Sequence, residues 1–538
     1  MAKALTVVPP TYDLSPSLAV AVVSLTVLLR VAVGYQPHSG QDNFHGLHSA
    51  YGGDFEAQRH WMELTWQLPI GEWYWYDLYY WGLDYPPLTA YVSWVCGALS
   101  SLLLGPESVE LVRSRGLEDP VHKAYMRATV LVLDMALYGS VVWFVTRRYQ
   151  QRYNTESVWS FGLAMAQPAI LLIDHGHFQY NTTALGLALW SFYYMSRPAF
   201  INCVIGSVLY CMALSFKQMT LYYAPAVFFY LLGRCFADKG KYAAPRFVAL
   251  GATVMVTFVS LWWPFVVYGP DDTAVLERLM HVIRRIIPLQ RGLFEGKVSN
   301  IWCALSVKPV RIRNRIPANL QPLAALFLTL ALAAPAAYKL FLTGRARRID
   351  ASVARSSSRS SGASDWTLLL WGTTASALAF FLASFQVHEK SLLLVLAPAS
   401  LLLLDDGPFV IWFSILAAWT MWPLLVMDRL QTAYVCTILI FVALTKLRSV
   451  LCVVAATKPS QSFFANWLFR WIPAASYAVM LALHVAEATV TVPVHLPDLF
   501  PVLWSVVGCG FCCTAWLVTC WHLFGSNQQE QESRHKMS

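Results

Sequence analysis

Long apolar runs separated by short polar loops make up most of the chain. Many of these runs have about 17 to 23 residues, which is enough for a helix to cross a bilayer. The first run, 17–34, is too long for the apolar part of a signal peptide and has no small-residue cleavage site, which indicates a retained anchor. The pattern therefore predicts an all-α polytopic membrane protein.

Basic residues set the predicted orientation. They gather in short loops at 147–152, 239–241, 345–348 and 445–448, as the positive-inside rule expects of cytosolic loops. Both termini are then cytosolic, and the net charge of +9 reflects topology rather than nucleic-acid binding. The fourteen predicted crossings are 17–34, 124–146, 155–172, 182–196, 200–216, 219–235, 244–268, 319–343, 365–385, 390–404, 408–427, 430–446, 470–489 and 499–523.

The apolar stretch 88–105 is expected not to cross, because a crossing there would move every later basic loop to the other side. It is interpreted as an interfacial helix, and 54–67 as a second one. The Ser-rich stretch 352–364 has the composition of a flexible linker and the polar tail that of a disordered segment. The predicted parts are a cytosolic 1–16, a first helix 17–34, a far-side loop 35–123, a membrane module 124–268, a far-side loop 269–318, a second membrane module 319–523 and a cytosolic tail 524–538.

Two polar motifs in the first far-side loop stand out, because only 13% of all residues are charged. The motif YGGDFEAQRHW (51–61) contains Asp54, Arg59 and His60, and the residues Glu56, Arg59 and Glu63 fall at helical spacing after Asp54. Asp54 could cap a helix and its neighbours could form a solvated face, or Asp54 could be a general base. The motif LDYPP (83–87) offers Asp84 either as a cap for the next helix or as a contact for a hydroxylated substrate.

The motif DHGHFQYN (174–181) concentrates hydrogen-bonding side chains between two apolar helices, among them His177 and Gln179. A lone histidine is usually structural, but such a dense group favours a binding site. Metal ligation by Asp174, His175 and His177 is the less favoured alternative, because their spacing is not diagnostic of a metal site.

Two further motifs, RGLFEGK (291–297) and HEKS (388–391), place cations on the same predicted face. They could be topology anchors, or they could hold a phosphate. The residues concerned are Arg291, Glu295, Lys297, His388 and Lys390. One reaction joins these observations: a sugar leaves a polyprenyl phosphate whose charge the cations stabilise, and Asp54 takes the proton of the attacking hydroxyl.

Seven motifs, in order, resemble those of the glucosyltransferase family that extends the dolichol-linked oligosaccharide of the endoplasmic reticulum, over about residues 35 to 505. They are YGGDFEAQRHW, YWGLDYPPLTAY, DHGHFQYN, FKQM, RGLFEGKVSNIWC, HEKS and LPDLFP. The resemblance implies a GT-C fold with a lumenal active site in the endoplasmic reticulum membrane. It also implies dolichyl phosphate glucose as donor, a dolichyl-pyrophosphate oligosaccharide as acceptor, an inverting transfer to an α-1,3 linkage, and no metal or other cofactor.

The resemblance maps the catalytic carboxylate of the first lumenal loop onto Asp54. The expected donor site comprises Arg291, His388, Lys390, Glu389, His177 and Gln179. Acceptor contacts or support are expected from Arg59, His60, Asp84 and Glu295. EAQRHW with WGLDYPPLTAY is similar to the members that add the first glucose to the nine-mannose precursor. Addition of the second glucose stays open, as does a lipid or solute transporter, a class that many crossings also suit.

Overall fold

The computed structural model describes residues 16–36, 53–149, 154–270, 272–287, 293–294, 298–347, 354–451, 463–465 and 469–535. Within these ranges the regular elements are all helices, and no strand occurs. The α-helices are α1 (Pro16–Gly34), α2 (Asp54–Gln67), α3 (Pro87–Leu104), α4 (Pro120–Leu133), α5 (Ser140–Tyr149), α6 (Asn154–Met165), α7 (Pro168–Ile170), α8 (Asn181–Met195), α9 (Phe200–Phe216), α10 (Ala224–Cys235), α11 (Ala243–Val267), α12 (Val275–Ile286), α13 (Ile301–Leu305), α14 (Gln321–Ala346), α15 (Ala354–Ala383), α16 (Leu392–Ser400), α17 (Gly407–Thr420), α18 (Trp422–Met427), α19 (Gln431–Leu451), α20 (Ile472–Thr489) and α21 (Leu499–His535).

Nine helices of the described part are long and apolar enough to cross a membrane. A tenth candidate is a broken span in which Ser157–Met165 and Pro168–Phe178 meet at an angle of 43°. Pro168 explains the break, because proline cannot donate a backbone hydrogen bond and therefore starts a new helix. The predicted all-α polytopic fold is confirmed, whereas the predicted count of fourteen crossings is not.

Several predicted crossings are helices shorter than the ~20 residues that a membrane span needs, and three of them end beside polar motifs. They are α8 with 15 residues, α9 with 17 and α16 with 9. Nearly every residue of α8 and all of α16 are buried, so these helices pack inside the protein. Each has one end beside a polar motif: α8 starts at Asn181, α9 ends just before Lys217, and α16 starts shortly after Lys390. The short helices therefore carry polar side chains into the interior.

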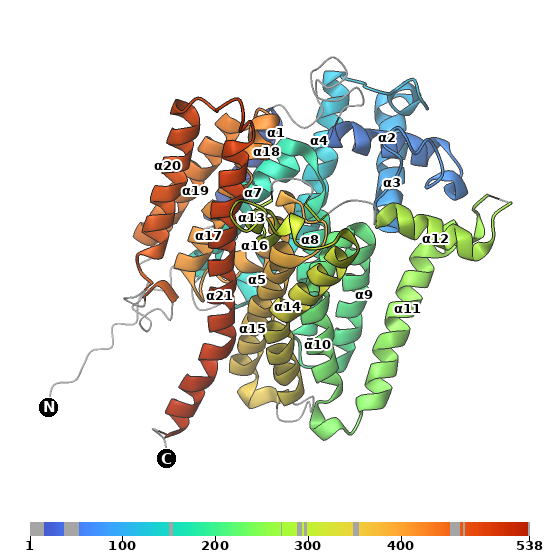
Figure 1. Ribbon diagram of the computed structural model, residues 1–538. Coiled ribbons are helices and arrows are strands. Elements are labelled where there is room, and N and C mark those ends of the chain that lie inside the picture. The colour runs from blue at the N-terminus through green and yellow to red at the C-terminus, as the bar shows by residue number, and fades with distance from the viewer. Residues whose placement is uncertain are drawn as a thin grey trace.

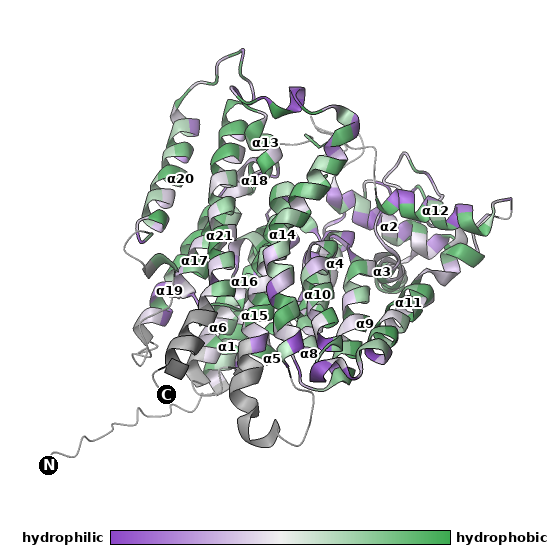
Figure 2. Cartoon of the chain, turned by 60° about the horizontal axis from the view of Figure 1, so that its bottom comes forward, coloured by the Kyte–Doolittle hydropathy of each residue, from purple (hydrophilic) through white to green (hydrophobic). Residues whose placement is uncertain are grey.

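The long helices pack side by side, while two helices run across them (Figure 1). Helices α10, α14, α15 and α21 are successive neighbours in the bundle. The α2 helix lies across the direction of α3, and α12 crosses the end of α11 (Figure 1). The long helices are largely hydrophobic along their length, whereas α2 and α12 carry many hydrophilic residues (Figure 2). This contrast is typical of spans combined with helices outside the apolar layer.

The predicted helix 54–67 is confirmed with the same bounds. The predicted loop 269–318 contains two short helices, α12 and α13, and its position outside the membrane stays a prediction. The helix α3 is itself long and apolar enough to span, so its interfacial position stays a prediction.

Two predicted unstructured segments are also wrong. Helix α15 begins at Ala354, inside the predicted linker, and α21 continues to His535 in the predicted tail. Both are continuations of long apolar helices. Extending an existing helix needs no new nucleus, so even a Ser-rich segment can continue it.

Candidate active site

Asp54 is the first residue of α2. Gly53 takes the cap position in an extended conformation, with φ −126° and ψ −153°, so the interpretation of Asp54 as the cap residue is wrong. A carboxylate in the first turn is favourable because the N-terminal end of a helix carries partial positive charge. The side chain of Asp54 is 29% exposed. It therefore stays accessible to a substrate while its position is fixed.

Three side chains from distant parts of the chain contact one oxygen of Asp54, Oδ2. His177 Nε2 lies 2.8 Å from it and Lys390 Nζ 2.9 Å from it. Gln179 Nε2 donates a hydrogen bond to the same oxygen. Lys390 Nζ and His177 Nε2 are also 3.0 Å apart. The structure thus brings together four residues that the sequence analysis assigns to the reaction centre.

His177 lies in a π-helical segment, η4 (Leu171–Phe178), that continues from α7. Its other ring nitrogen, Nδ1, lies 2.5 Å from Asp428 Oδ2, at the end of α18. The segment ends at Phe178 with φ +78°, a conformation that is strained for a bulky residue. Phe178 packs edge-on against Phe55, with ring centroids 4.8 Å apart. This contact ties the π-helical segment to the start of α2, next to Asp54.

A second cation, Lys217, stands behind Gln179. Its Nζ lies 3.0 Å from Gln179 Oε1 and also contacts Asn181 Oδ1. A small cavity of about 10 Å³ is lined by Lys217 together with Lys390. The sequence analysis missed Lys217 as a site residue, although a single lysine between two apolar helices was an available signal.

The charges of the site act on one another. Burial raises the pKa of Asp54, but Lys390 and His177 outweigh it and hold that pKa well below its usual range. Burial lowers the pKa of Lys217 to about 8, and the positive charge of Lys390 acts in the same direction. Asp54 is therefore ionised at neutral pH, while Lys217 can lose its proton in mildly alkaline solution.

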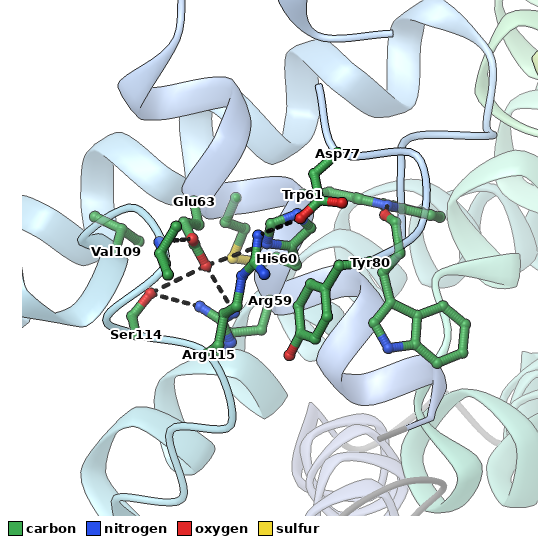
Figure 3. A network of polar contacts seen from close by, with 12 residues as sticks. Arg59, His60, Trp61, Glu63, Asp77, Tyr80, Val109, Ser114 and Arg115 are labelled. Carbon is green, nitrogen blue, oxygen red and sulfur yellow. Dashed lines mark hydrogen bonds and ion pairs between the residues drawn. The ribbon is translucent and has the colours of Figure 1, made fainter. Parts of the chain in front are cut away.

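Arg59 and His60 belong to a different network, buried between α2 and the segment before α4 (Figure 3). Arg59 Nη2 lies 2.6 Å from Glu56 Oε1 and 2.7 Å from Glu63 Oε2. Arg59 Nη1 donates to Ser114 Oγ at 2.6 Å, and His60 Nδ1 lies 3.2 Å from Glu63. These residues are buried, so the interpretation as a solvated face is wrong, and their contacts are those of structural support.

Asp84 lies half-buried near the site. Helix α3 begins at Pro87 with Pro86 in the cap position, so Asp84 is two residues outside it and the helix-cap interpretation is wrong. The Tyr85 ring, next to Asp84 in the chain, lies 5.2 Å from Lys217 Nζ, and the negative charge of Asp84 partly offsets the lowering of the Lys217 pKa by burial. This places Asp84 where a substrate hydroxyl near Lys217 could be bound.

Four predicted site residues remain, and the structure describes two of them. His388 is exposed and Glu389 is half-buried, both directly before Lys390. Arg291 and Glu295 lie outside the described residues, so their predicted roles stay predictions.

The alternative of a metal site at DHGHFQYN finds no matching geometry. Its three candidate ligands have different partners: Asp174 accepts from Asn181 and Thr182, His175 lies beside Asp134, and His177 contacts Asp54 and Asp428. Among the described residues no group of three or more His, Cys, Asp or Glu side chains could hold a metal ion.

The fold and the site define a polytopic membrane protein with a carboxylate and two cationic side chains at the ends of short buried helices. The model of the ALG6, ALG8 glycosyltransferase family matches residues 26–519. The chain belongs to this family, and its all-α fold is that of a GT-C glycosyltransferase.

Curated relatives match over most of their length. The chain is 36% identical over 510 residues to the dolichyl pyrophosphate Man9GlcNAc2 alpha-1,3-glucosyltransferase of Gallus gallus, covering 91% of this chain and 94% of that protein. It is 33% identical over 536 residues to the enzyme of that name from Saccharomyces cerevisiae, covering 94% and 91%. A probable enzyme of the same name from Schizosaccharomyces pombe is 36% identical over 457 residues, covering 84% and 82%.

Proposed function

We propose that this protein transfers glucose from dolichyl phosphate glucose to the nine-mannose oligosaccharide on dolichyl pyrophosphate, and forms an α-1,3 linkage. The names of the relatives support the acceptor and the linkage. The resemblance of the motifs supports the donor. The observation that carries the proposal is the partly exposed carboxylate of Asp54, which Lys390 and His177 hold at 2.9 and 2.8 Å.

The proposed step is a single displacement. The acceptor hydroxyl oxygen forms a bond to the anomeric carbon of glucose, and the bond from that carbon to the phosphate oxygen breaks. The electron pair leaves with dolichyl phosphate, and the hydroxyl proton passes to Asp54. The phosphate gains negative charge as it departs, and Lys390 offsets that charge, so the proposed step uses no metal or other cofactor.

The contact between Lys390 and Asp54 links binding of the donor phosphate to removal of the proton from the acceptor hydroxyl. A carboxylate whose pKa is held low is a weak base. A phosphate brought close to Lys390 offsets its positive charge and raises the pKa of Asp54. Donor binding thus makes Asp54 a better base, and the carboxylate gains basicity only when the sugar to be transferred is in place.

The proposed setting is the endoplasmic reticulum membrane, with the site on the lumenal side and both termini in the cytosol. The distribution of basic loops supports this orientation. Both substrates carry polyprenyl chains, which suits a site at the end of membrane helices.

The test uses the purified full-length protein in lipid nanodiscs with a chelator present. Dolichyl phosphate glucose and a nucleotide-linked glucose are compared as donors, and nine-mannose acceptors with and without one glucose as acceptors. The proposal expects transfer only from dolichyl phosphate glucose and only to the acceptor without glucose. Transfer only to the glucosylated acceptor would instead indicate addition of the second glucose. No transfer to either acceptor would contradict the enzymatic function.

A further inference from the structure

Three ionisable side chains from three different helices meet in the interior, away from Asp54. They are Arg30 on α1, Asp134 at the start of the π-helical segment η3 (Asp134–Gly139), and His175 in η4. Arg30 Nε lies 2.5 Å from Asp134 Oδ2, and His175 Nε2 lies 2.9 Å from the same oxygen. Their exposed fractions are 1%, 0% and 4%.

Such a cluster inside apolar helices needs a reason, because charges in a membrane-spanning segment are strongly disfavoured. A buried ion pair by itself adds little stability compared with well-packed apolar residues. Two of the three residues also lie in π-helical segments, which are rare and occur mostly at functional sites. The proposed reaction does not use any of the three directly.

The cluster also fixes the backbone around the broken span. Arg30 Nη1 donates to Thr26 O at 3.1 Å and to Met165 O at 3.0 Å. Met165 is the last residue of α6, just before the bend that leads into η4. Arg30 and Asp134 therefore hold both the start of the bend, through Met165, and the π-helical segment after it, through His175.

His175 and His177 are two residues apart in the same π-helical segment. His175 is held from one side by Asp134, whereas His177 reaches Asp54 and Asp428. A rotation of the segment by a fraction of a turn would move the imidazole of His177 away from Asp54. The orientation of the reaction centre thus depends on the contact that His175 makes.

We propose that Arg30, Asp134 and His175 are positioning residues for glucose transfer: the Asp134 carboxylate holds η4 through His175 and so fixes His177 against Asp54. This inference rests on the proposed function. The three residues do not touch the substrate, and their effect passes through the geometry of η4.

The test compares two variants of His175 in the purified full-length protein. In His175→Gln, a side-chain N–H still reaches Asp134, whereas in His175→Leu that donor is lost. The expected result is that kcat falls by about 10- to 100-fold in His175→Leu, as for a misplacement of about 1 Å. KM for the donor changes little, and His175→Gln recovers most of kcat.

The pH profile separates positioning from general loss of folding. Lys390 and His177 hold the pKa of Asp54 low, so a displaced His177 lets that pKa rise. The acid limb of the kcat/KM profile is expected to move to higher pH in His175→Leu but not in His175→Gln. A smaller folded fraction would lower the whole profile without moving the limb.

Arg234 offers a matched control, because it too is a fully buried arginine on a predicted span. It donates to Met195 O at 3.1 Å and to Pro198 O at 2.6 Å, away from η4. Arg234→Gln is expected to lower thermal stability and to leave kcat per folded molecule and the acid limb unchanged.

The outcomes distinguish the two proposals. If His175→Leu keeps kcat and the position of the acid limb, the positioning role is wrong even where Asp54→Asn is inactive. A kcat loss of the same size in His175→Gln and His175→Leu, with no movement of the limb, also contradicts it. If Asp54→Asn is fully active, the proposed function itself fails.

Discussion

Helix α2 carries two polar networks that differ in how far their side chains are exposed. The closed network comprises Glu56, Arg59, His60, Glu63 and Ser114, and the open network comprises Asp54, His177, Gln179 and Lys390. Around Arg59, two carboxylates, a serine and a histidine bond one another, and every one of these side chains is buried. Around Asp54, one carboxylate oxygen takes three contacts, and the side chains of Asp54 and Lys390 remain 29% and 18% exposed. The first network lies five residues from the second on the same helix.

The difference separates a structural role from a chemical one. In the closed network Glu63 is bound by Arg59, His60 and the Val112 N–H, and these contacts outweigh burial and lower its pKa to about 2. Such a group can neither bind a substrate nor accept a proton at neutral pH. In the open network a phosphate can compete for Lys390 and so change the basicity of Asp54. A partly exposed carboxylate whose cationic partner can also bind a substrate therefore identifies the active site better than the number of charged residues does.

The largest expected effect is on the open network. Asp54→Asn removes the proton acceptor and keeps the shape of the side chain, so glucose transfer is expected to fall by about 10³-fold, the order of a general base contribution. The measurement is the initial rate of glucose transfer by purified protein at saturating substrates. Transfer within about tenfold of the unchanged protein would exclude Asp54 as the base.

A change in the closed network is expected to act on folding instead. Arg59→Met leaves Glu56 and Glu63 buried without their cation, and should lower the free energy of unfolding by about 3 to 5 kcal/mol. Thermal unfolding in detergent measures the loss. The rate per folded molecule should stay close to that of the unchanged protein, and a selective loss of rate with normal stability would contradict the structural role.

A smaller effect is expected from pH. Lys217 is charged below about pH 8 and neutral above it, because burial lowers its pKa. Activity should therefore fall as the pH rises through about 8. Lys217→Arg keeps the positive charge, since arginine does not lose its proton in this range, and should move the alkaline limb upward. A limb at the same pH in this variant would show that another group titrates there.

The smallest effect is expected at Asp84. In Asp84→Asn the hydrogen bond from a substrate hydroxyl loses its charged acceptor, which is worth about 1 kcal/mol, so KM for the acceptor should rise by about fivefold and kcat should stay unchanged. Acceptor titration at saturating donor measures this. An unchanged KM would show that Asp84 does not bind the acceptor.

Much of this site was predictable from the motifs. Asp54, His177, Gln179 and Lys390 come from segments up to 336 residues apart in the chain, and the structure brings them together. The positive-inside rule predicts that all four lie on the same side of the membrane. They meet there because each lies at or close to the end of a helix. The helix 54–67 was predictable because Phe55, Trp61 and Trp66 fit an amphipathic helix.

Other features depend on packing that single motifs do not reveal. The spacing of Glu56, Arg59 and Glu63 suits a solvated face, and only the segment carrying Ser114, which covers them, shows that they are buried. Asp428 is a lone carboxylate in an apolar stretch, and its partner His177 lies 251 residues away. The short helices were predicted as crossings because apolar length does not distinguish burial in protein from burial in lipid.

The most direct test of the account compares two carboxylate-to-amide changes on the same helix, Asp54→Asn and Glu63→Gln. Glucose transfer per folded molecule and the thermal unfolding midpoint are measured on both proteins in one preparation. The account predicts that Asp54→Asn loses transfer and keeps its unfolding midpoint, while Glu63→Gln keeps transfer and unfolds at a lower temperature. Transfer retained in Asp54→Asn, or lost equally in both at equal stability, would contradict it.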